Sequence, residues 1–369
     1  MALPASKTAN EPAGTLPDRL PDRLPDRLLA WYDAHGRTLP WRTRGGGRPD
    51  PYHVWLSEIM LQQTTVATVG PYFRTFLDRW PAIADLSRAE LDDVLHAWAG
   101  LGYYSRARNL HACARYVVEA LEERFPETVD GLLALPGVGP YTAAAIAAIA
   151  FNRPATVVDG NVERVMARFY GLQTPLPALK KDVHVHAERL TPRARPGDYA
   201  QAVMDLGATV CTPKNPRCSG CPWADDCVAL ATGQTAELPR RAPKKTKPTR
   251  RGIAFWLTRA DGAVLLRKRP AKGLLGGMME VPCSPWVADD ASREDHLAHA
   301  PASADWQEMP GEVRHTFTHF HLELTMVRAV VTGQGADGPD GTWAAPHEFS
   351  NHALPTLMTK LIKHALDAE

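Results

Sequence analysis

Four cysteines near residue 220 have the residue type and the spacing of a metal centre. Cys211, Cys218, Cys221 and Cys227 follow the pattern C-x6-C-x2-C-x5-C. Four thiolates in so short a span are expected to ligate one centre. Structural zinc usually uses two paired CxxC motifs, and this run has only one, so zinc remains the weaker alternative.

Two carboxylates are candidates for acid–base chemistry. Glu58 lies among apolar residues in WLSEIMLQQT (Trp55–Thr64). Partial burial in such surroundings raises the pKa of a carboxyl group and keeps its proton available for donation. An exposed helical glutamate is the commoner alternative for a lone Glu. Asp159 precedes a helix expected to begin near Gly160, where an N-cap role is compatible with a chemical one.

A glycine-rich turn separates these carboxylates in the sequence. Gly137 and Gly139 allow a close backbone approach, and an Ala-rich helix expected to start at Pro140 presents amides suited to an anion. The turn alone is weak evidence, since many helix–helix connections contain one.

Composition limits the class of protein. A chain of 369 residues exceeds one ordinary core, which predicts two domains. The net charge of +1 gives no support for nucleic-acid binding, so any basic surface must come from uneven distribution. The longest apolar run is far too short for a membrane span, and no apolar signal region directs the chain out of the cytosol.

The pattern of apolar residues predicts two kinds of domain. Helical spacing continues from Leu28 to about Thr209 with no strand alternation before residue 250, which indicates an all-α first domain. Strands are expected at 253–258, 263–268, 313–317 and 321–331, with a closing helix at 357–366, which indicates an α+β module. Ser87 with Glu90 predicts a capping box for the helix that follows.

The domain boundaries follow from composition. Residues 1–24, which hold the PDRL repeats that start at Pro17 and Pro21 and precede a third at Pro25, predict a disordered leader. Residues 25–235 are expected to form the all-α domain and 252–369 the second domain. Residues 236–251 hold seven basic residues and predict a linker, either a solvated connector or a strap that contacts phosphate.

Several separate motifs resemble the MutY family of adenine DNA glycosylases. WLSEIMLQQT is similar to that family's catalytic segment, and GVGPY is similar to the helix-hairpin-helix that grips a DNA phosphate, here about 131–151. The cysteine spacing over 211–227 is similar to the [4Fe–4S] motif of endonuclease III and MutY. The resemblance covers about residues 28–366 and implies a [4Fe–4S] cluster held by the four cysteines.

The resemblance also implies a mechanism with two carboxylates. Glu58 would protonate N7 of a flipped-out adenine, and Asp159 would stabilise the positive sugar that forms, as in glycoside hydrolysis. Asn161 would position a carboxylate or a water. Endonuclease III-type lyases carry a nucleophilic Lys where this chain has Tyr141, so hydrolysis without lyase activity is expected.

Residues that the resemblance implies in contacts with DNA come from five segments. An aromatic after the Gly-Leu-Gly turn could enter the base stack, and Gln63 would fill the gap left by the flipped base. On spacing alone, Tyr103 would more often be a core aromatic. The expected contacts are Leu39, Trp41, Arg42, Gln63, Thr64, Val66, Gly102, Tyr103, Gly137, Gly139 and Asp205.

The second domain resembles a Nudix hydrolase fold through GLLGGMMEVP at 273–282. Residues 291–299 lack the dense acidic cluster that holds the metal of that chemistry, so a Nudix-like fold without its activity is expected. Phe317, Thr318 and His319 resemble the Phe-Ser-His loop that reads oxidised guanine. Thr318 keeps the hydroxyl and adds a methyl group, which leaves the selectivity between oxidised and normal guanine open.

We therefore expect a monomeric enzyme that removes adenine opposite 8-oxoguanine or guanine in double-stranded DNA. It is expected in the cytoplasm, at the nucleoid, of a bacterium, or in the nucleus or mitochondria of a eukaryote. The expected fold class is an all-α helix-hairpin-helix glycosylase domain with a [4Fe–4S] loop, followed by an α+β Nudix-like domain. The alternatives are a mismatch thymine or endonuclease III-type glycosylase, a Nudix-type nucleotide pyrophosphatase, and a non-catalytic iron–sulfur DNA-binding protein.

Overall fold

The structure is a computed structural model that describes residues 23–43, 47–243, 246–288, 291–331 and 340–368. It divides into two compact units, one from Met1–Glu58 and Phe125–Pro243 and the other from Ile59–Arg124 and Lys244–Glu369. Residues 1–22 of the predicted leader lie outside the described residues, and helix α1 begins at Leu24, the last residue of the second PDRL repeat. The predicted boundaries at 235 and 251 stay a prediction.

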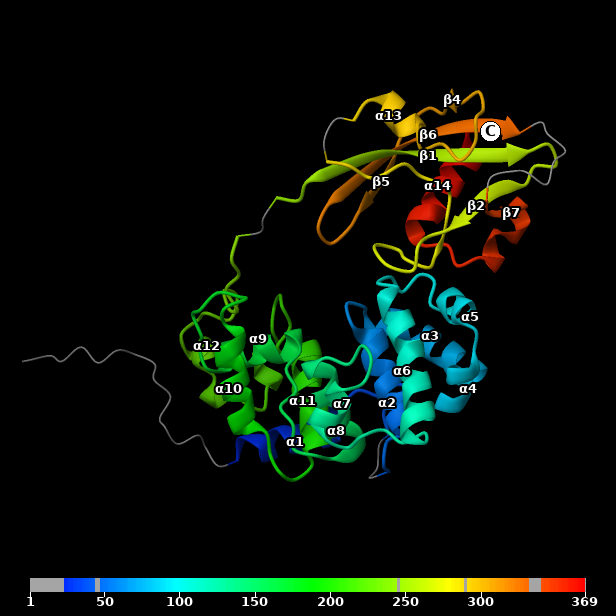
Figure 1. Ribbon diagram of the computed structural model, residues 1–369. Coiled ribbons are helices and arrows are strands. Elements are labelled where there is room, and N and C mark those ends of the chain that lie inside the picture. Colours follow the sequence, from blue (N-terminus) through cyan, green and yellow to red (C-terminus); the bar gives the residue numbers. More distant parts are fainter. Residues whose placement is uncertain (1–22, 44–46, 244–245, 289–290, 332–339, 369) are drawn as a thin grey trace, which may run out of the picture. The chain divides into compact units, whose positions relative to one another are not determined.

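Helices make up the chain up to residue 231 (Figure 1). No named strand precedes residue 249 in the described part of the chain, which confirms the all-α prediction. None of the described helices is long and apolar enough to cross a membrane. The helices are α1 (Leu24–His35), α2 (Pro51–Leu61), α3 (Val66–Arg79), α4 (Ile83–Arg88), α5 (Leu91–Ala97), α6 (Ser105–Leu121), α7 (Val129–Leu133), α8 (Pro140–Phe151), α9 (Gly160–Phe169), α10 (Lys180–Leu190), α11 (Pro196–Thr209) and α12 (Val228–Ala231).

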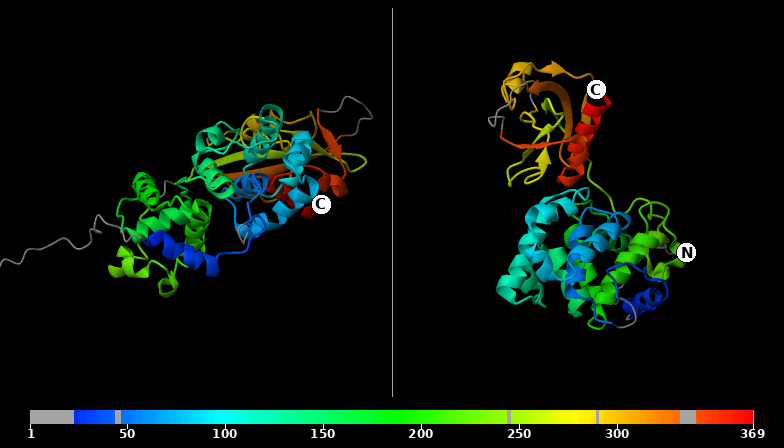
Figure 2. Two further views of the ribbon diagram at one scale, coloured as in Figure 1. Left: turned by 90° about the horizontal axis from the view of Figure 1, so that it is seen from below. Right: turned by 90° about the vertical axis from the view of Figure 1, so that its right-hand side faces the viewer.

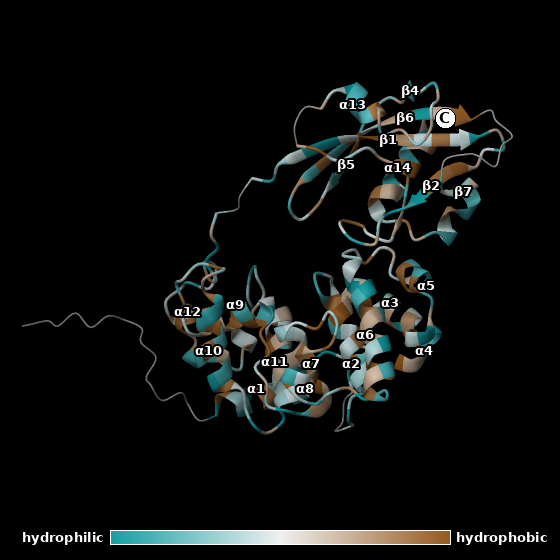
Figure 3. Cartoon of the chain, in the orientation of Figure 1, coloured by the Kyte–Doolittle hydropathy of each residue, from teal (hydrophilic) through white to brown (hydrophobic). Residues whose placement is uncertain are grey.

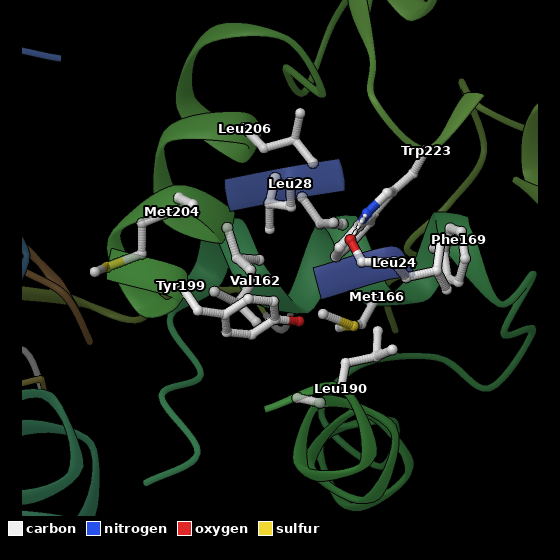
Figure 4. Packing of buried hydrophobic residues seen from close by; sticks show 14 of the residues in the cluster. Leu24, Leu28, Val162, Met166, Phe169, Leu190, Tyr199, Met204, Leu206 and Trp223 are labelled. Carbon is white, nitrogen blue, oxygen red and sulfur yellow. Dashed lines mark hydrogen bonds between the residues drawn. The ribbon is translucent and has the colours of Figure 1, made fainter. Parts of the chain in front are cut away.

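The core of the first unit is built by amphipathic helices around α9. Its buried residues Val162, Val165, Met166 and Phe169 recur at helical spacing and therefore share one face. Figure 4 shows that face against residues of α1, α10 and α11 and against Trp223 of the cysteine loop. The loop is therefore part of the core of this unit.

Helix α8 packs differently, because it carries small residues on every side. Its alanines are buried around the whole helix, which lets α11 approach closely. A Cβ atom at Gly197 of α11 would lie 2.5 Å from the carbonyl oxygen of Ala148. The close approach fixes the position of α8, the helix that follows the Gly137–Gly139 turn.

In the second unit, helices α3 to α6 carry both hydrophobic and hydrophilic residues along their length (Figure 3). Phe76 of α3 packs edge-on against Trp98, with ring centroids 5.8 Å apart. The capping box predicted at Ser87 and Glu90 is wrong. Ser87 lies inside α4, where its hydroxyl donates to the carbonyl of Ala84 (2.8 Å), and Glu90 is the N-cap of α5 without a side-chain cap.

A mixed seven-stranded sheet follows, which confirms the predicted α+β module. Its central strands β1 (Thr249–Arg259) and β6 (His321–Val331) run parallel, from Thr249 opposite His321 to Arg259 opposite Val331. The order is β3-β2-β1-β6-β4, with β5 paired to β6 and β7 to β2. The remaining strands are β2 (Val264–Lys268), β3 (Met279–Glu280), β4 (Gln307–Glu308), β5 (Val313–Thr316) and β7 (Thr342–Ala344).

Alternate residues of β1 serve two cores, because successive side chains of a strand point to opposite faces. Ala254 and Trp256 belong to the cluster that includes α14 (Thr356–Asp367), which lies along the sheet in Figure 2. Ile253 and Phe255 pack with Leu297 of α13 (Arg293–Leu297) on the other face. The buried run in β1 therefore reflects a strand covered on both faces.

We predict that Gly197→Ala destabilises the protein by about 1 to 3 kcal/mol, because the added methyl group overpacks the α8–α11 contact. Thermal unfolding of the purified protein would measure the change. Gly70→Ala is the matched control, since a Cβ atom there meets nothing within 4 Å and helix propensity favours alanine. An equal response of the two variants would contradict close packing at Gly197.

Candidate active site

Glu58 is a buried carboxyl group near the C-terminal end of α2. It is 5% exposed, and the hydroxyl of Tyr141, at the start of α8, donates to its Oε2 (2.8 Å). Burial raises the pKa of Glu58 to about 7, although the hydrogen bond from Tyr141 lowers it. The negative charge of Asp159 raises this pKa and Arg42 lowers it. A carboxyl group with such a pKa can hold and donate a proton near neutral pH.

Asp159 is held in one orientation by the start of α9. Its Oδ1 accepts hydrogen bonds from the backbone N–H groups of Asn161 (2.9 Å) and Val162 (2.7 Å), so it is the N-cap of the helix. Its Oδ2 accepts a hydrogen bond from Asn161 Nδ2 (2.8 Å). Both carboxylate oxygens are therefore fixed, which confirms the N-cap role, while the role of Asp159 in a reaction stays a prediction.

Asn161 is itself locked by two residues that the sequence analysis missed. Arg164 donates to Asn161 Oδ1 (2.8 Å) and to the carbonyl of Gly207 (2.7 Å). A Cβ atom at Gly207 would lie 2.6 Å from the Cβ atom of Asn161. Arg164 is buried although it points away from the apolar face of α9, so the helical pattern in the sequence gives no signal of its role.

The glycine turn has the expected geometry at the start of α8. Gly137 has a φ of 75°, a conformation that favours glycine. Gly139 is the N-cap and offers no side-chain acceptor to the first amides, and Pro140 is the first helical residue. These are the features of a helix start that suits an anion.

Asp205 lies in α11 and is completely buried. Arg42 makes a two-pronged ion pair with it (2.7 and 2.9 Å), and Arg37 donates through its backbone N–H (2.8 Å) and its Nε (2.7 Å). Burial alone would raise the pKa of Asp205, but hydrogen bonds and charge from the two arginines lower it overall. Arg37 was missed by the sequence analysis. Arg42 and Asp205, two of the residues expected to contact DNA, are thus brought together. Trp41, the residue before Arg42, is buried, and Leu39 is half-buried.

Gln63 and Tyr103, the wedge residues that are predicted to enter the base stack, lie on two turns of the second unit. Gln63 and Thr64 follow α2, and Val66 begins α3. Gln63 and Tyr103 have φ values of 58° and 48°, a strained conformation for a residue with a side chain. Tyr103 follows Gly102 and is 49% exposed, so it is not the core aromatic that spacing alone favours. Helix α6 starts at Ser105 because this turn precedes it.

Phe317, Thr318 and His319 form the turn between β5 and β6. The turn closes through a hydrogen bond from Phe317 N–H to the carbonyl of Phe320 (2.9 Å), and Phe317 stacks on Trp286. The hydroxyls of Tyr103 and Thr318 lie 2.8 Å apart. A cavity of about 390 Å³ in this unit is lined by the three turn residues together with Tyr103. The structure thus brings Tyr103 together with residues 317–319, the turn predicted to recognise oxidised guanine.

A basic residue of the predicted linker supports the same turn. Lys247 Nζ donates to the carbonyl of Phe317 (2.9 Å), and the guanidinium of Arg250 lies 4.4 Å from the ring centroid of Phe320. Strand β1 begins at Thr249, within the predicted linker range. Lys247 and Arg250 therefore contact the protein itself.

The four cysteines follow α11 in a loop packed on α1 and α9. Cys211, Cys221 and Cys227 are half-buried against the core of the first unit, and no cysteine forms a disulfide. Arg168 Nη1 donates to Cys211 Sγ (3.4 Å), and such donors to sulfur accompany thiolate-bound iron. Among the residues that the structure describes, no three Cys, His, Asp or Glu side chains converge to hold a single metal ion. The donor set fits a thiolate-ligated cluster.

Family models match three parts of the chain. Residues 56–192 match the HhH-GPD superfamily of base excision DNA repair proteins, and residues 253–364 match the NUDIX domain. Residues 211–227 match the iron–sulfur binding domain of endonuclease III, which assigns an iron–sulfur cluster to the cysteine loop.

Proteins named adenine DNA glycosylase are similar over most of the chain. The Homo sapiens protein is 37% identical over 397 residues, which cover 91% of this chain and 72% of the relative. The Rattus norvegicus protein is 36% identical over 397 residues and is covered to 76%. Among solved structures, a thermostable thymine-DNA glycosylase is similar with a TM-score of 0.50 and 28% identity, covering 56% of this chain and 95% of that one.

We predict that Glu58→Gln stabilises the protein increasingly as pH rises. The pKa of Glu58 is raised in the fold, from 4.5 to about 7, so the unfolded chain releases this proton first and the wild type loses stability between those pH values. Glutamine avoids the loss, which amounts to about 2 to 3 kcal/mol above pH 7.

Thermal unfolding of both proteins at pH 5, 6, 7 and 8 would measure this difference. Glu119→Gln on the exposed surface of α6 is the matched control and should show no such trend. A constant difference between Glu58→Gln and wild type across the series would contradict the raised pKa.

Proposed function

We propose that this chain, which belongs to the adenine DNA glycosylase family, acts as a monomer on adenine paired with 8-oxoguanine or with guanine. Removal of adenine from DNA is the activity of the family. The substrate pair, the roles of individual residues and the type of cluster are our proposal. The observation that carries the catalytic part is the buried Glu58, bonded to Tyr141 beside the fixed carboxylate of Asp159.

In the proposed reaction, Glu58 donates its proton to N7 of the extruded adenine. Protonation turns the base into a better leaving group, and the C1′–N9 bond breaks with its electron pair going to adenine. Positive charge develops on the sugar, and Asp159 stabilises it electrostatically, because both of its oxygens are already oriented. A water molecule then adds to C1′ and loses a proton, which leaves an abasic site.

Tyr141 makes the proposed reaction monofunctional. Its phenol donates to Glu58, and burial raises the pKa of Tyr141 well above its ordinary value. A neutral phenol bonded in this way cannot form the Schiff base through which a lysine would cleave the DNA strand. Asn161 has a positioning role, since it binds Asp159 on one side and Arg164 on the other.

The proposed discrimination of the opposite base rests on the exposed β5–β6 turn. 8-Oxoguanine differs from guanine by an N7–H donor and an O8 acceptor. The Thr318 hydroxyl can both donate and accept, and it lies at a cavity that Tyr103 and His319 also line. This turn would therefore contact the base left behind when adenine is extruded, while Gln63 and Tyr103 fill the stack.

We expect single-turnover assays to release adenine from A:8-oxoguanine and A:guanine duplexes and no thymine from T:guanine. Glu58→Gln should lower release by about two to four orders of magnitude, since it removes the general acid, while duplex binding changes little. Borohydride should trap little covalent complex with the wild type.

Each result has a contrary outcome. Thymine release without adenine release would favour the thymine glycosylase alternative. A large loss of binding in Glu58→Gln would mean a structural role, and efficient borohydride trapping would contradict monofunctional hydrolysis.

We also propose that the cluster is of the [4Fe–4S] type, bound by Cys211, Cys218, Cys221 and Cys227. The number of thiols and their spacing support this type, as does the Arg168 donor to Cys211. Chemical analysis should find about four iron and four sulfide per chain with broad visible absorption. One zinc per chain without sulfide, in protein purified without added metal, would contradict the proposal.

A further inference from the structure

Arg106 is a buried cation of the second unit. It lies near the start of α6, is 8% exposed, and its side chain reaches two segments far apart in the sequence. Nη1 donates to the carbonyls of Ile59 (2.9 Å) and Met60 (3.0 Å) in the last turn of α2. Nη2 donates to the carbonyls of Leu101 (2.9 Å) and Gly102 (3.1 Å). One guanidinium group therefore joins the end of α2 to the turn before α6.

The charge of Arg106 has no carboxylate partner among the residues that the structure describes. Its acceptors are backbone carbonyls and, at 3.4 Å, the Thr64 hydroxyl, and Trp98 and Tyr103 lie under its guanidinium at 5.2 and 5.6 Å. The last carbonyls of a helix lack helical partners and carry partial negative charge, which favours a cation there. Burial lowers the pKa of Arg106 to about 10, so it stays charged at neutral pH. A buried charge without a counterion is costly and points to a specific function.

The two segments that Arg106 joins are those that carry the proposed wedges. Gln63 lies two residues after the end of α2, and Tyr103 directly follows Gly102. Gln63 and Tyr103 both have left-handed backbone, and Gly102, which directly precedes Tyr103, has a φ of 70°. Strained turns of this kind persist only where the surrounding contacts determine them. Hydrogen bonds from one guanidinium to both turns are such contacts.

We propose that Arg106 is a positioning residue that fixes the Gln63 turn and the Tyr103 turn as one rigid body for insertion into the base stack. The inference rests on the wedge roles in the proposed function. With the turns joined, the ordering of both side chains is complete before DNA binds, and insertion of one requires insertion of the other. Without the hydrogen bonds from Arg106, extrusion of the base would be slower, because the two turns would have to be ordered separately.

Two variants separate the effect of the planar, forked guanidinium group of Arg106 from the effect of its positive charge. Arg106→Lys keeps a cation but lacks the planar fork, so it cannot span carbonyls on both segments. Arg106→Met keeps the apolar stem and removes every donor. Arg115→Met is the control on the same helix, because Arg115 is exposed and pairs with Glu119.

The experiment measures extrusion and chemistry separately with the full-length protein. Stopped-flow fluorescence follows a duplex with 2-aminopurine in place of the target adenine, and single-turnover assays with enzyme in excess follow adenine release from A:8-oxoguanine. We expect extrusion to slow about tenfold in Arg106→Lys and about a hundredfold in Arg106→Met, with release falling in parallel. Duplex affinity should change less than tenfold, and Arg115→Met should match the wild type.

Unfolding midpoints and cluster absorbance identify the folded fraction of each variant. If Arg106→Met fails to fold, Arg106→Lys decides, and wild-type extrusion by folded Arg106→Lys would overturn the proposal. The proposal would also be overturned if the rate of base extrusion fell only in proportion to the loss of folded protein. Failure of the wild type itself to extrude 2-aminopurine or release adenine would instead contradict the proposed function.

Discussion

The reaction that we propose depends on keeping one carboxyl group, Glu58, protonated inside a folded domain. Burial supplies the necessary rise in pKa, and the surroundings limit it. A neutral hydroxyl from Tyr141 and the more distant Arg42 lower the pKa of Glu58, and the negative Asp159 raises it. The result, about 7, is a balance that a full positive charge beside Glu58 would destroy.

The second carboxylate is positioned by a chain of contacts that ends at the cysteine loop. Asn161 holds Asp159, Arg164 holds Asn161, and Arg164 Nε also donates to the carbonyl of Cys211 (2.7 Å). Gly207 accepts from Arg164 and leaves the space that Asn161 occupies. In the proposed reaction, an iron–sulfur cluster that orders the loop would therefore also order the partner of Asp159, and this structural part requires no electron transfer.

The sequence was sufficient where chemistry and local structure coincide. Glu58, Asp159 and Tyr141 stand in motifs, and their proximity follows once the motifs are assigned to one site. The all-α and α+β parts also followed, since helical spacing and strand alternation are local properties. The roles of the predicted DNA contacts stay predictions, although the structure places Tyr103 beside Thr318.

The sequence was insufficient where a residue acts across the fold. Arg37, Arg106 and Arg164 each bind groups on other elements, and nothing within a few residues of them indicates which groups these are. The Ser87 capping box failed for a related reason, because the pattern was present but the helix boundary lay elsewhere. An arginine on an apolar helical face was a usable signal only for Arg106, which shares the buried face of α6 with Leu110 and Val117.

The identity of residue 141 shows how closely these features are coupled. A lysine at this position would place an ammonium group near Glu58, where Tyr141 now donates a neutral hydrogen bond. The ammonium charge would stabilise the carboxylate and lower the pKa of Glu58, so the acid would lose its proton at neutral pH. In this surrounding, a charged lysine at position 141 would thus oppose a protonated Glu58. The phenol of Tyr141 donates a hydrogen bond to the acid without adding a positive charge, and this is the physical argument for the hydrolysis without lyase activity that we propose.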